Sequence, residues 1–179
     1  MTYKLKEKYN KEVVPQMIEK FGYKSKMAVP KIEKVTVNSG IGSVKDDARK
    51  EMIRDHLAII TGQRPSERSA KKSIASFKIR EGLHIGYSAT LRGKRMYDFL
   101  ERMIFVAIPR GRDFRGLDVK SVDSSGNLTI GFKDHLIFPE MMGEDTRNSF
   151  GFSVTIVTTA KNREESVEFL RLMGIPFKK

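Results

Sequence analysis

Hydrophobic residues recur at two different spacings along the chain, and these spacings predict which segments form helices and which form strands. Four segments repeat apolar residues every three or four positions, which is the period of an amphipathic α-helix. They cover residues 5–21, 46–60, 94–107 and 162–173. Pro15 lies inside the first segment and predicts a kink or two short helices, whereas Pro109 is expected to end the third helix. Asn162 and Glu165 have the spacing of a capping box at the start of the last helix.

Alternating apolar and polar residues, the period of a half-buried strand, mark six further segments. They are residues 31–38, 73–80, 84–92, 119–123, 128–132 and 153–159. Turn residues at 81–83 and at 124–127 predict two hairpins, 62–72 reads as a loop, and 133–150 shows no clear period. Hairpins mixed with helices predict a single α+β domain over residues 1–179, with a mainly antiparallel sheet and helices packed on one face.

The uncovered face of this predicted sheet is polar. Three strands are expected to present small polar or cationic side chains there: Lys34, Thr36 and Asn38, then Ser76, Lys78 and Arg80, then Ser88, Thr90 and Arg92. No aromatic residue is among them, which argues against the stacking of single-stranded bases seen in an RNA recognition motif. Short hydroxyls and amides beside cations suit the minor groove and the 2′-hydroxyls of folded RNA. An ordinary solvent-exposed sheet face would alternate in the same way.

The charge of the chain favours the RNA interpretation. The 179 residues carry a formal net charge of +12. Between Thr61 and Gly116 there are 13 Lys and Arg residues against 5 Asp and Glu residues, so this segment alone holds +8. Clustered cations are typical of a protein that binds a polyphosphate backbone, and a merely solvated surface is the alternative.

Several other functions are disfavoured. The chain has no Cys, which removes thiolate metal sites, catalytic cysteines and disulfides. Its three His residues are far apart in sequence and lack metal-ligand spacing, so neither a metal nor a cofactor is expected. Gly40 and Gly42 resemble the start of a dinucleotide-binding loop, but Lys45 occupies the third glycine position. A nucleotide-using enzyme is therefore the least favoured class, and no catalytic residue is assigned.

The location of the protein follows from its charged N-terminus and its short apolar runs. The first residues contain no apolar core of a signal peptide, and no stretch approaches the roughly 20 apolar residues of a membrane span. We expect a cytoplasmic protein with no membrane partner.

Eight sequence blocks together resemble a known family. They are VTVNSGIG (35–42), GQRP (62–65), AKKSIASFKIREG (70–82), ATLRG (89–93), RMYDFL (95–100), PRGRDFRG (109–116), IFPE (137–140) and the ending GIPFKK. Their order and spacing resemble the bacterial ribosomal protein L5 family of the large (50S) subunit, from Leu5 to Lys179. The chain departs from the family pattern at Ser39, where Met is usual, and within 141–148.

This resemblance implies a structural constituent of the large ribosomal subunit rather than an enzyme. Such a protein binds 5S rRNA and helps attach it, beside 23S rRNA and other ribosomal proteins, in the central protuberance. The resemblance places 5S rRNA contacts at Asn38, Gln63 and Thr90. Polar and cationic neighbours complete the predicted 5S site, namely Lys34, Thr36, Arg64 and Arg92.

Two further partners follow from the same resemblance. The loop 70–82 would face the P-site tRNA, with contacts from Lys71, Lys72, Ser73, Lys78 and Arg80. A bridge to small-subunit ribosomal protein S13 would fall within 109–146 and involve Arg110, Arg112 and Arg115. The alternative is a non-ribosomal RNA-binding module or an assembly factor.

Overall fold

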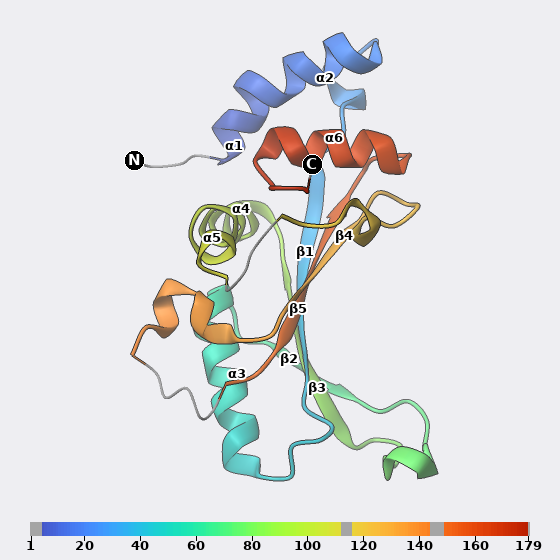
Figure 1. Ribbon diagram of the computed structural model, residues 1–179. Helices are drawn as coiled ribbons and strands as arrows, with labels where there is room; N and C mark the ends of the chain where they lie inside the picture. The colour runs from blue at the N-terminus through green and yellow to red at the C-terminus, as the bar shows by residue number, and fades with distance from the viewer. Residues whose placement is uncertain (1–4, 112–115, 144–148, 179) are drawn as a thin grey trace.

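A five-stranded sheet forms the centre of the protein in the computed structural model, which describes residues 5–111, 116–143 and 149–178 (Figure 1). The strand order is β2-β3-β1-β5-β4, and each neighbouring pair is antiparallel. The strands are β1 (Ile32–Gly40), β2 (Ser66–Ser69), β3 (His84–Leu91), β4 (Leu128–Phe132) and β5 (Phe152–Thr158). The first and last strands of the chain thus lie side by side in the middle of the sheet.

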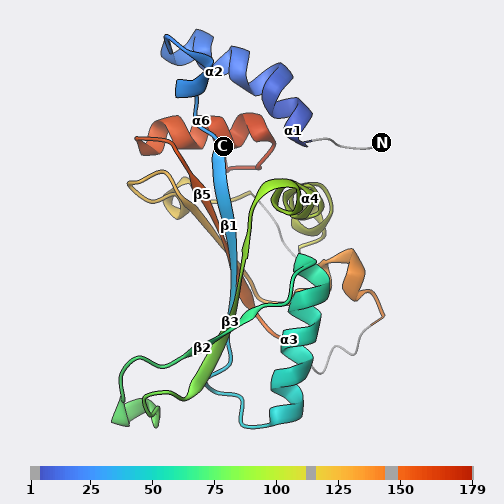
Figure 2. The same cartoon turned by 180° about the vertical axis from the view of Figure 1, so that it is seen from behind.

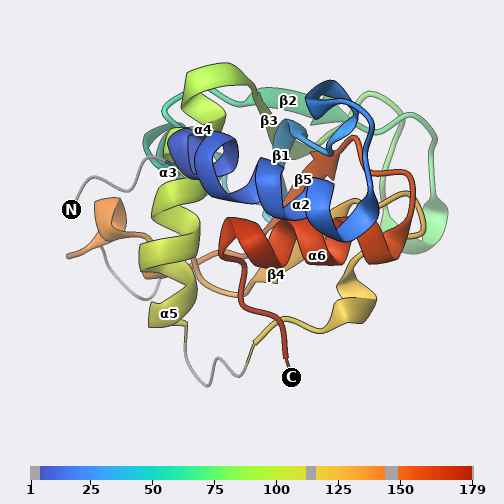
Figure 3. The ribbon, with the colours of Figure 1, turned by 90° about the horizontal axis from the view of Figure 1, so that it is seen from above.

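Helices cover one face and one end of this sheet. Helices α3, α4 and α5 lie on one side, and α1, α2 and α6 cross one end (Figures 1, 2 and 3). The α-helices are α1 (Leu5–Lys8), α2 (Val14–Phe21), α3 (Asp47–Thr61), α4 (Gly93–Arg102), α5 (Ile108–Arg110) and α6 (Arg163–Met173). Short 3₁₀ turns are η2 (Lys26–Ala28), η3 (Ala75–Phe77), η5 (Val119–Ser121), η6 (His135–Ile137) and η7 (Pro139–Met141). The predicted α+β class is confirmed.

One face of the sheet supplies the hydrophobic core. On β1, Val35 lies opposite Leu91 of β3 and Ile156 of β5, and all three side chains are fully buried. Phe99 of α4 and Phe169 of α6 belong to the same continuous apolar cluster. Burying a side chain of this kind stabilises the fold by roughly 1.5–3 kcal/mol. The alternation that puts these residues inside leaves the intervening polar residues on the opposite face.

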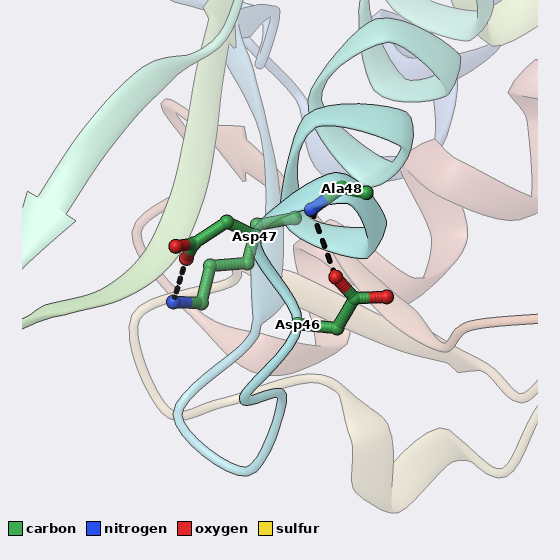
Figure 4. A network of polar contacts seen from close by, with 4 residues as sticks. Asp46, Asp47 and Ala48 are labelled. Carbon is green, nitrogen blue, oxygen red and sulfur yellow. Dashed lines mark hydrogen bonds and ion pairs between the residues drawn. The ribbon is translucent and has the colours of Figure 1, made fainter.

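Helix α3 begins and ends within one residue of its predicted limits. The Asp46 carboxylate accepts a hydrogen bond from the backbone N–H of Ala48 at 3.1 Å and so caps the helix (Figure 4). The Asp47 carboxylate lies 2.7 Å from the Lys50 ammonium, and this hydrogen bond and charge lower the pKa of Asp47. Gly62 ends the helix in the left-handed conformation, with φ of 67°.

Both helix prolines are preceded by a π turn. The turns are η1 (Tyr9–Val13), before Pro15, and η4 (Met103–Ala107), before Pro109. In each turn a backbone N–H bonds to the carbonyl five residues earlier. This wider turn accommodates the proline ring, which would otherwise clash with the carbonyl four residues before it. The predicted division of the first helix is confirmed, but Pro109 does not end the third helix, because α5 continues to Arg110.

The segment 73–80 is not a strand, contrary to the prediction. It contains the 3₁₀ turn η3, and Lys78 has a positive φ of 54°, which breaks an extended chain. Strand β3 pairs instead with β2, which lies inside the stretch 62–72 that was expected to be a loop. Alternating apolar and polar residues indicate a strand when the apolar side chains share a buried face. Here Phe77, an apolar residue at the tip of the segment, is exposed, so the alternation was misleading.

The second predicted hairpin is confirmed at its turn but not in its first strand. Gly126 has a φ of 79° in the turn, and the strand after it is β4. The segment 119–123 forms the 3₁₀ turn η5 and a single bridge between Val122 and Leu128. The long partner of β4 is β5, whose predicted limits agree closely with the structure. The segment 133–150 contains η6 and η7.

Helix α6 begins without the predicted capping box. Asn162 has the backbone conformation of an N-cap residue, but its side chain makes no capping hydrogen bond. The Glu165 carboxylate accepts a hydrogen bond from the backbone N–H of Lys161 at 2.7 Å. Its other oxygen accepts a hydrogen bond from the Tyr23 hydroxyl. The buried carboxylate thus joins Tyr23, which lies just after α2, to α6.

Candidate nucleic-acid interface

Two rows of small polar residues cross the open face, which is the face of the sheet opposite the hydrophobic core. The first row runs over four strands and consists of Thr90, Thr36, Thr155 and Thr129. The second row runs over all five strands and consists of Ser66, Ser88, Asn38, Ser153 and Gly131. Directly opposed residues in antiparallel strands point to the same side, so each row is a line of hydroxyl and amide side chains, which in the second row ends at Gly131.

Some of these polar groups are engaged within the sheet and others are not. The hydroxyls of Thr129 and Thr155 are 3.1 Å apart, and Ser66 donates to the Ser88 carbonyl at 2.9 Å. The side chains of Thr36, Asn38 and Thr90 have no hydrogen-bond partner among the described residues, and Asn38 is exposed. Unpartnered donors and acceptors at the centre of the face are available to a ligand.

The structure brings Gln63 to the edge of the first row. Its side-chain amide donates a hydrogen bond to the Thr90 carbonyl, with Nε2 and O 3.4 Å apart. The hydroxyl of Thr61, in the last turn of α3, donates to the Gln63 carbonyl at 2.9 Å. These contacts place a residue from the α3–β2 connection beside a residue of β3. The three residues predicted to contact 5S rRNA, Asn38, Gln63 and Thr90, therefore lie on one surface.

Cations flank the polar rows. Lys34 lies on the open face of β1, two positions before Thr36, and is half-buried. Arg92 directly follows β3 at the N-cap position of α4, and Arg64 directly follows Gln63; both arginines are exposed. The arrangement puts hydrogen-bonding groups at the centre and guanidinium groups at the side. The first can contact ribose and base edges, and the second can contact phosphates.

About half of the residues on this face were not predicted from the sequence. They are Ser66, Thr129, Gly131, Ser153 and Thr155. For the four residues of β4 and β5 the available signal was alternation within the predicted strands 128–132 and 153–159, but alternation does not reveal which strands are neighbours. Ser66 lies in the stretch 62–72, which was expected to be a loop. No Phe, Tyr or Trp occurs at the paired positions of the two rows, as predicted for this face.

Three residues predicted on the open face lie elsewhere. Ser76, Lys78 and Arg80 belong to the 70–83 loop, which connects β2 to β3 and projects from the end of the sheet away from α1 and α2 (Figures 1 and 2). The prediction failed because it treated this loop as a strand. Five residues proposed for tRNA contact do share the loop and are exposed, namely Lys71, Lys72, Ser73, Lys78 and Arg80.

The predicted bridge region lies only partly within the described residues. Arg110 is exposed at the end of α5, and its guanidinium lies 3.4 Å from the Met142 sulfur. Arg112 and Arg115 lie outside the described residues. The contact with Met142 brings together two parts of the 109–146 segment that are separated by β4.

Other chemistry has little support in the structure. Within the described ranges, no group of three or more His, Cys, Asp or Glu side chains could hold a metal ion. Gly40 is part of β1 and pairs with Gly86, and α3 begins only at Asp47, so no glycine loop enters a helix as a dinucleotide site requires. Across the same described ranges, no helix has the length and apolar character of a membrane span.

Comparison with known proteins gives matches over nearly the whole chain. A family model described as the ribosomal L5P family C-terminus matches residues 84–177, and one described as Ribosomal protein L5 matches residues 25–80. The large ribosomal subunit protein uL5 of Streptococcus sanguinis (strain SK36) is 50% identical over 180 residues and is aligned over 100% of both chains. The protein of the same name from Alkaliphilus oremlandii (strain OhILAs) is 50% identical over 177 residues, covering 98% of this chain and 99% of its own.

Proposed function

Because the chain belongs to the ribosomal protein L5 family, a family of structural and non-enzymatic large-subunit proteins, we propose that its open face binds 5S rRNA. The observation that carries this proposal is the pair of polar rows, at whose centre the side chains of Thr36, Asn38 and Thr90 have no hydrogen-bond partner among the described residues. At a spacing of about 4.8 Å per strand, five strands span roughly 19 Å. A polar surface of this width suits the shallow minor groove of a folded RNA helix.

The mode of recognition follows from the residue types. Threonine and serine hydroxyls both donate and accept hydrogen bonds, as the ribose 2′-hydroxyl does, and the Asn38 amide offers two donors and an acceptor. Arg64, Arg92 and Lys34 supply the charge that holds the phosphate backbone. The hydroxyl and amide rows would thus select folded RNA, and the cations would supply most of the affinity.

We further propose the finer partners that the family resemblance implies. As a large-subunit protein, the chain works in the bacterial cytoplasm within the ribosome and has rRNA and ribosomal proteins as neighbours. The 70–83 loop would contact the P-site tRNA, and the 109–146 segment would contact small-subunit ribosomal protein S13. Contacts with 23S rRNA and the other central-protuberance proteins would complete its setting. A single domain over 1–179 is supported by the sheet, which takes strands from both matched segments.

The decisive experiment is 5S rRNA binding by the double variant Asn38→Ala with Thr90→Ala. Filter binding should show a substantially weaker complex, while circular dichroism and thermal unfolding stay close to those of the parent, because the variants remove no core side chain. A matched control is Asn162→Ala with Ser124→Ala, which removes an exposed amide and an exposed hydroxyl away from the rows. Unchanged 5S affinity in the first variant would reject the open face as the binding surface.

A non-ribosomal RNA-binding module or assembly factor is distinguished by stoichiometry. A structural component remains with 50S particles through a high-salt wash, in one copy per particle. A protein that washes off completely would behave as a factor instead.

A further inference from the structure

The C-terminal residues that follow helix α6 hold a segment that is far from them in the sequence. The Leu117 N–H donates a hydrogen bond to the Pro176 carbonyl at 2.8 Å, and the Lys178 N–H donates to the Leu117 carbonyl at 2.9 Å. Leu117 and Phe177 form a parallel β-bridge, so the two stretches of chain run side by side (Figure 3). Residues 176–178 are called the C-terminal strap below, because both backbone groups of Leu117 are bonded to them.

Gly116 lies directly against the C-terminal strap. A Cβ atom at this position would lie 2.8 Å from the Lys178 backbone nitrogen and 3.0 Å from the Phe177 carbonyl carbon, which is too close for either contact. Gly116 also has a φ of 95°, a conformation that residues with a side chain rarely adopt. Two independent requirements therefore call for glycine here, and one of them is the close approach of the strap.

Helix α6 anchors the strap at one end and holds the neighbouring chain from the other. Gly174 ends the helix in the left-handed conformation, and Ile175, which is buried in the core, fixes the start of the strap. At the first residue of the helix, the Arg163 guanidinium donates a hydrogen bond to the Val119 carbonyl at 2.7 Å. Leu117 and Val119 are therefore both tied to the same helix.

These contacts join two of the sequence blocks that carry the family resemblance. Gly116 is the last residue of PRGRDFRG (109–116), and the strap lies within the ending GIPFKK. The first block begins the segment 109–146, which is proposed to contact small-subunit ribosomal protein S13. None of the residues 174–178 belongs to the two polar rows of the open face. The contacts of the ending thus connect it to the bridge segment and not to the RNA-binding surface.

We propose that the C-terminal strap is a positioning element for the small-subunit contact, and that it acts by holding the segment 109–146 at Gly116 and Leu117. The inference rests on the proposed contact with S13, but the strap itself is not assigned to the contact surface. Asp118 and Lys120, which follow directly, are exposed and would be displaced together with Leu117. A segment that is already held in place loses less conformational entropy when a partner binds, so the strap raises the affinity for the small subunit.

Two pairs of variants test this role. Gly116→Ala places a methyl group against the strap, and Gly22→Ala is its control, because Gly22 also has a positive φ, of 69°, but its Cβ would face open space. Lys178→Pro removes the N–H that bonds to the Leu117 carbonyl, and proline has no other donor to replace it. Its control, Lys178→Ala, keeps the N–H and loses only an exposed side chain.

Amide hydrogen exchange at Leu117 reports the strap directly, because the Leu117 N–H is bonded to the Pro176 carbonyl. Gly116→Ala and Lys178→Pro should speed this exchange roughly two- to tenfold, the effect of losing one hydrogen bond of ordinary strength. The two controls should match the parent. The affinity for 5S rRNA, measured by filter binding, should be the same in all four variants. Unchanged exchange at Leu117 in both test variants would overturn the holding role of the strap.

The functional readout is the association of 50S particles that carry each variant with 30S subunits, followed by light scattering over a series of Mg²⁺ concentrations. Particles with Gly116→Ala or Lys178→Pro should need more Mg²⁺ than particles with the parent or either control. This difference should disappear with 30S subunits that lack S13, a dependence that a purely structural role of the strap would not produce.

The same measurements separate the positioning role from the S13 contact on which it rests. If parent particles respond to the loss of S13 while Gly116→Ala and Lys178→Pro associate as the parent does, the positioning role is overturned and the proposed contact stands. If parent particles associate equally well with and without S13, the proposed contact fails and the positioning role fails with it.

Discussion

The side-chain amide of Gln63 donates a hydrogen bond to the backbone carbonyl of Thr90, 3.4 Å away, and so fixes the α3–β2 connection beside the first polar row. Gln63 is half-buried, whereas its neighbour Arg64 is exposed. The bond therefore positions Arg64 at the side of the open face as well as Gln63 itself. A residue that is predicted to contact 5S rRNA thus also has a structural role.

We expect Gln63→Ala to affect binding and stability by different amounts. Loss of one long hydrogen bond should lower the free energy of unfolding by about 0.5–1 kcal/mol, measured by urea unfolding. The affinity for 5S rRNA should fall roughly two- to tenfold, because the amide and the position of Arg64 are lost together. Gln63→Glu, which keeps the shape but removes the donor and adds a negative charge, should bind more weakly than Gln63→Ala. The reverse order would contradict a contact with RNA at this position.

The dependence of 5S binding on salt should separate the cations from the polar rows. Each phosphate contact that is removed lowers the slope of log K against log salt by about one. Arg64→Ala with Arg92→Ala should therefore reduce that slope by about two. Thr36→Ala with Thr90→Ala should weaken binding but leave the slope of log K against log salt unchanged. The measurement is filter binding over a series of KCl concentrations, and identical slopes for the two double variants would contradict this division.

The sequence predicted which segments form helices and strands better than it predicted which strands pair with each other. The alternation about Val35 and the apolar period of α3 are local signals, and both elements lie where they were expected. The pairing of Thr36 with Thr155 is a long-range fact that depends on strand order. No local pattern contains that order, so the β4 and β5 half of the open face could not be found. The resemblance to a family supplied Gln63, whose side chain carries no periodic signal.

In the loop 70–83 a local pattern was present but predicted the wrong structure. The residues 73–80 alternate as a strand does, but their apolar members are not covered by another layer, and Lys78 turns the chain. A pattern reports which residues could share a face and not whether anything packs on it. A local pattern also failed at Pro109, which was expected to end a helix. The π turn before it accommodates the proline ring, and such a turn has no sequence signature of its own.

We expect Tyr23→Phe to weaken the contact between the chain just after α2 and helix α6. The Tyr23 hydroxyl donates to the buried Glu165 carboxylate, and its removal leaves that oxygen without the donor. The free energy of unfolding should fall by about 1–2 kcal/mol. Tyr97→Phe is a matched control, because the half-buried Tyr97 hydroxyl has no hydrogen-bond partner among the described residues, and this change should be nearly neutral. Equal effects of the two variants would contradict a specific role for the Tyr23 bond.

The same pair predicts the behaviour of the protein in alkali. Burial raises the pKa of Tyr23, and the hydrogen bond and charge of Glu165 raise it further. The folded protein therefore keeps the phenol proton at a pH where the unfolded chain, with a pKa near 10, has lost it. The contribution to stability is complete below pH 10 and is lost as the pH rises above it. The difference in unfolding free energy between the parent and Tyr23→Phe should shrink between pH 9 and pH 11.

Two histidines that are far apart in sequence are in contact: the half-buried His56 of α3 and the fully buried His135 of η6. His56 Nδ1 and His135 Nε2 are 3.2 Å apart, and His135 Nδ1 accepts a hydrogen bond from the Phe150 N–H at 3.4 Å. The His135 and Phe150 rings are stacked, with centroids 4.2 Å apart. His135 is 0% exposed. Burial, with a smaller effect of His56, lowers the pKa of His135 to about 4, so this side chain is neutral in the folded protein at pH 7.

Acid should therefore unfold the protein partly through His135. The pKa is lower in the folded state than the value of roughly 6.5 in the unfolded chain, so the unfolded state binds the proton first as the pH falls. The stability is complete above pH 6.5 and is lost between about pH 6.5 and pH 4, amounting to about 2 kcal/mol by pH 5. His135→Phe keeps a stacked ring but cannot bind a proton. Urea unfolding at pH 7.5 and pH 5 should show a lower starting stability for this variant, because two hydrogen bonds are lost, and a smaller decrease on acidification. The carboxylates that also titrate are common to both proteins and cancel in the comparison. An equal decrease in the two proteins would show that His135 does not control the acid response.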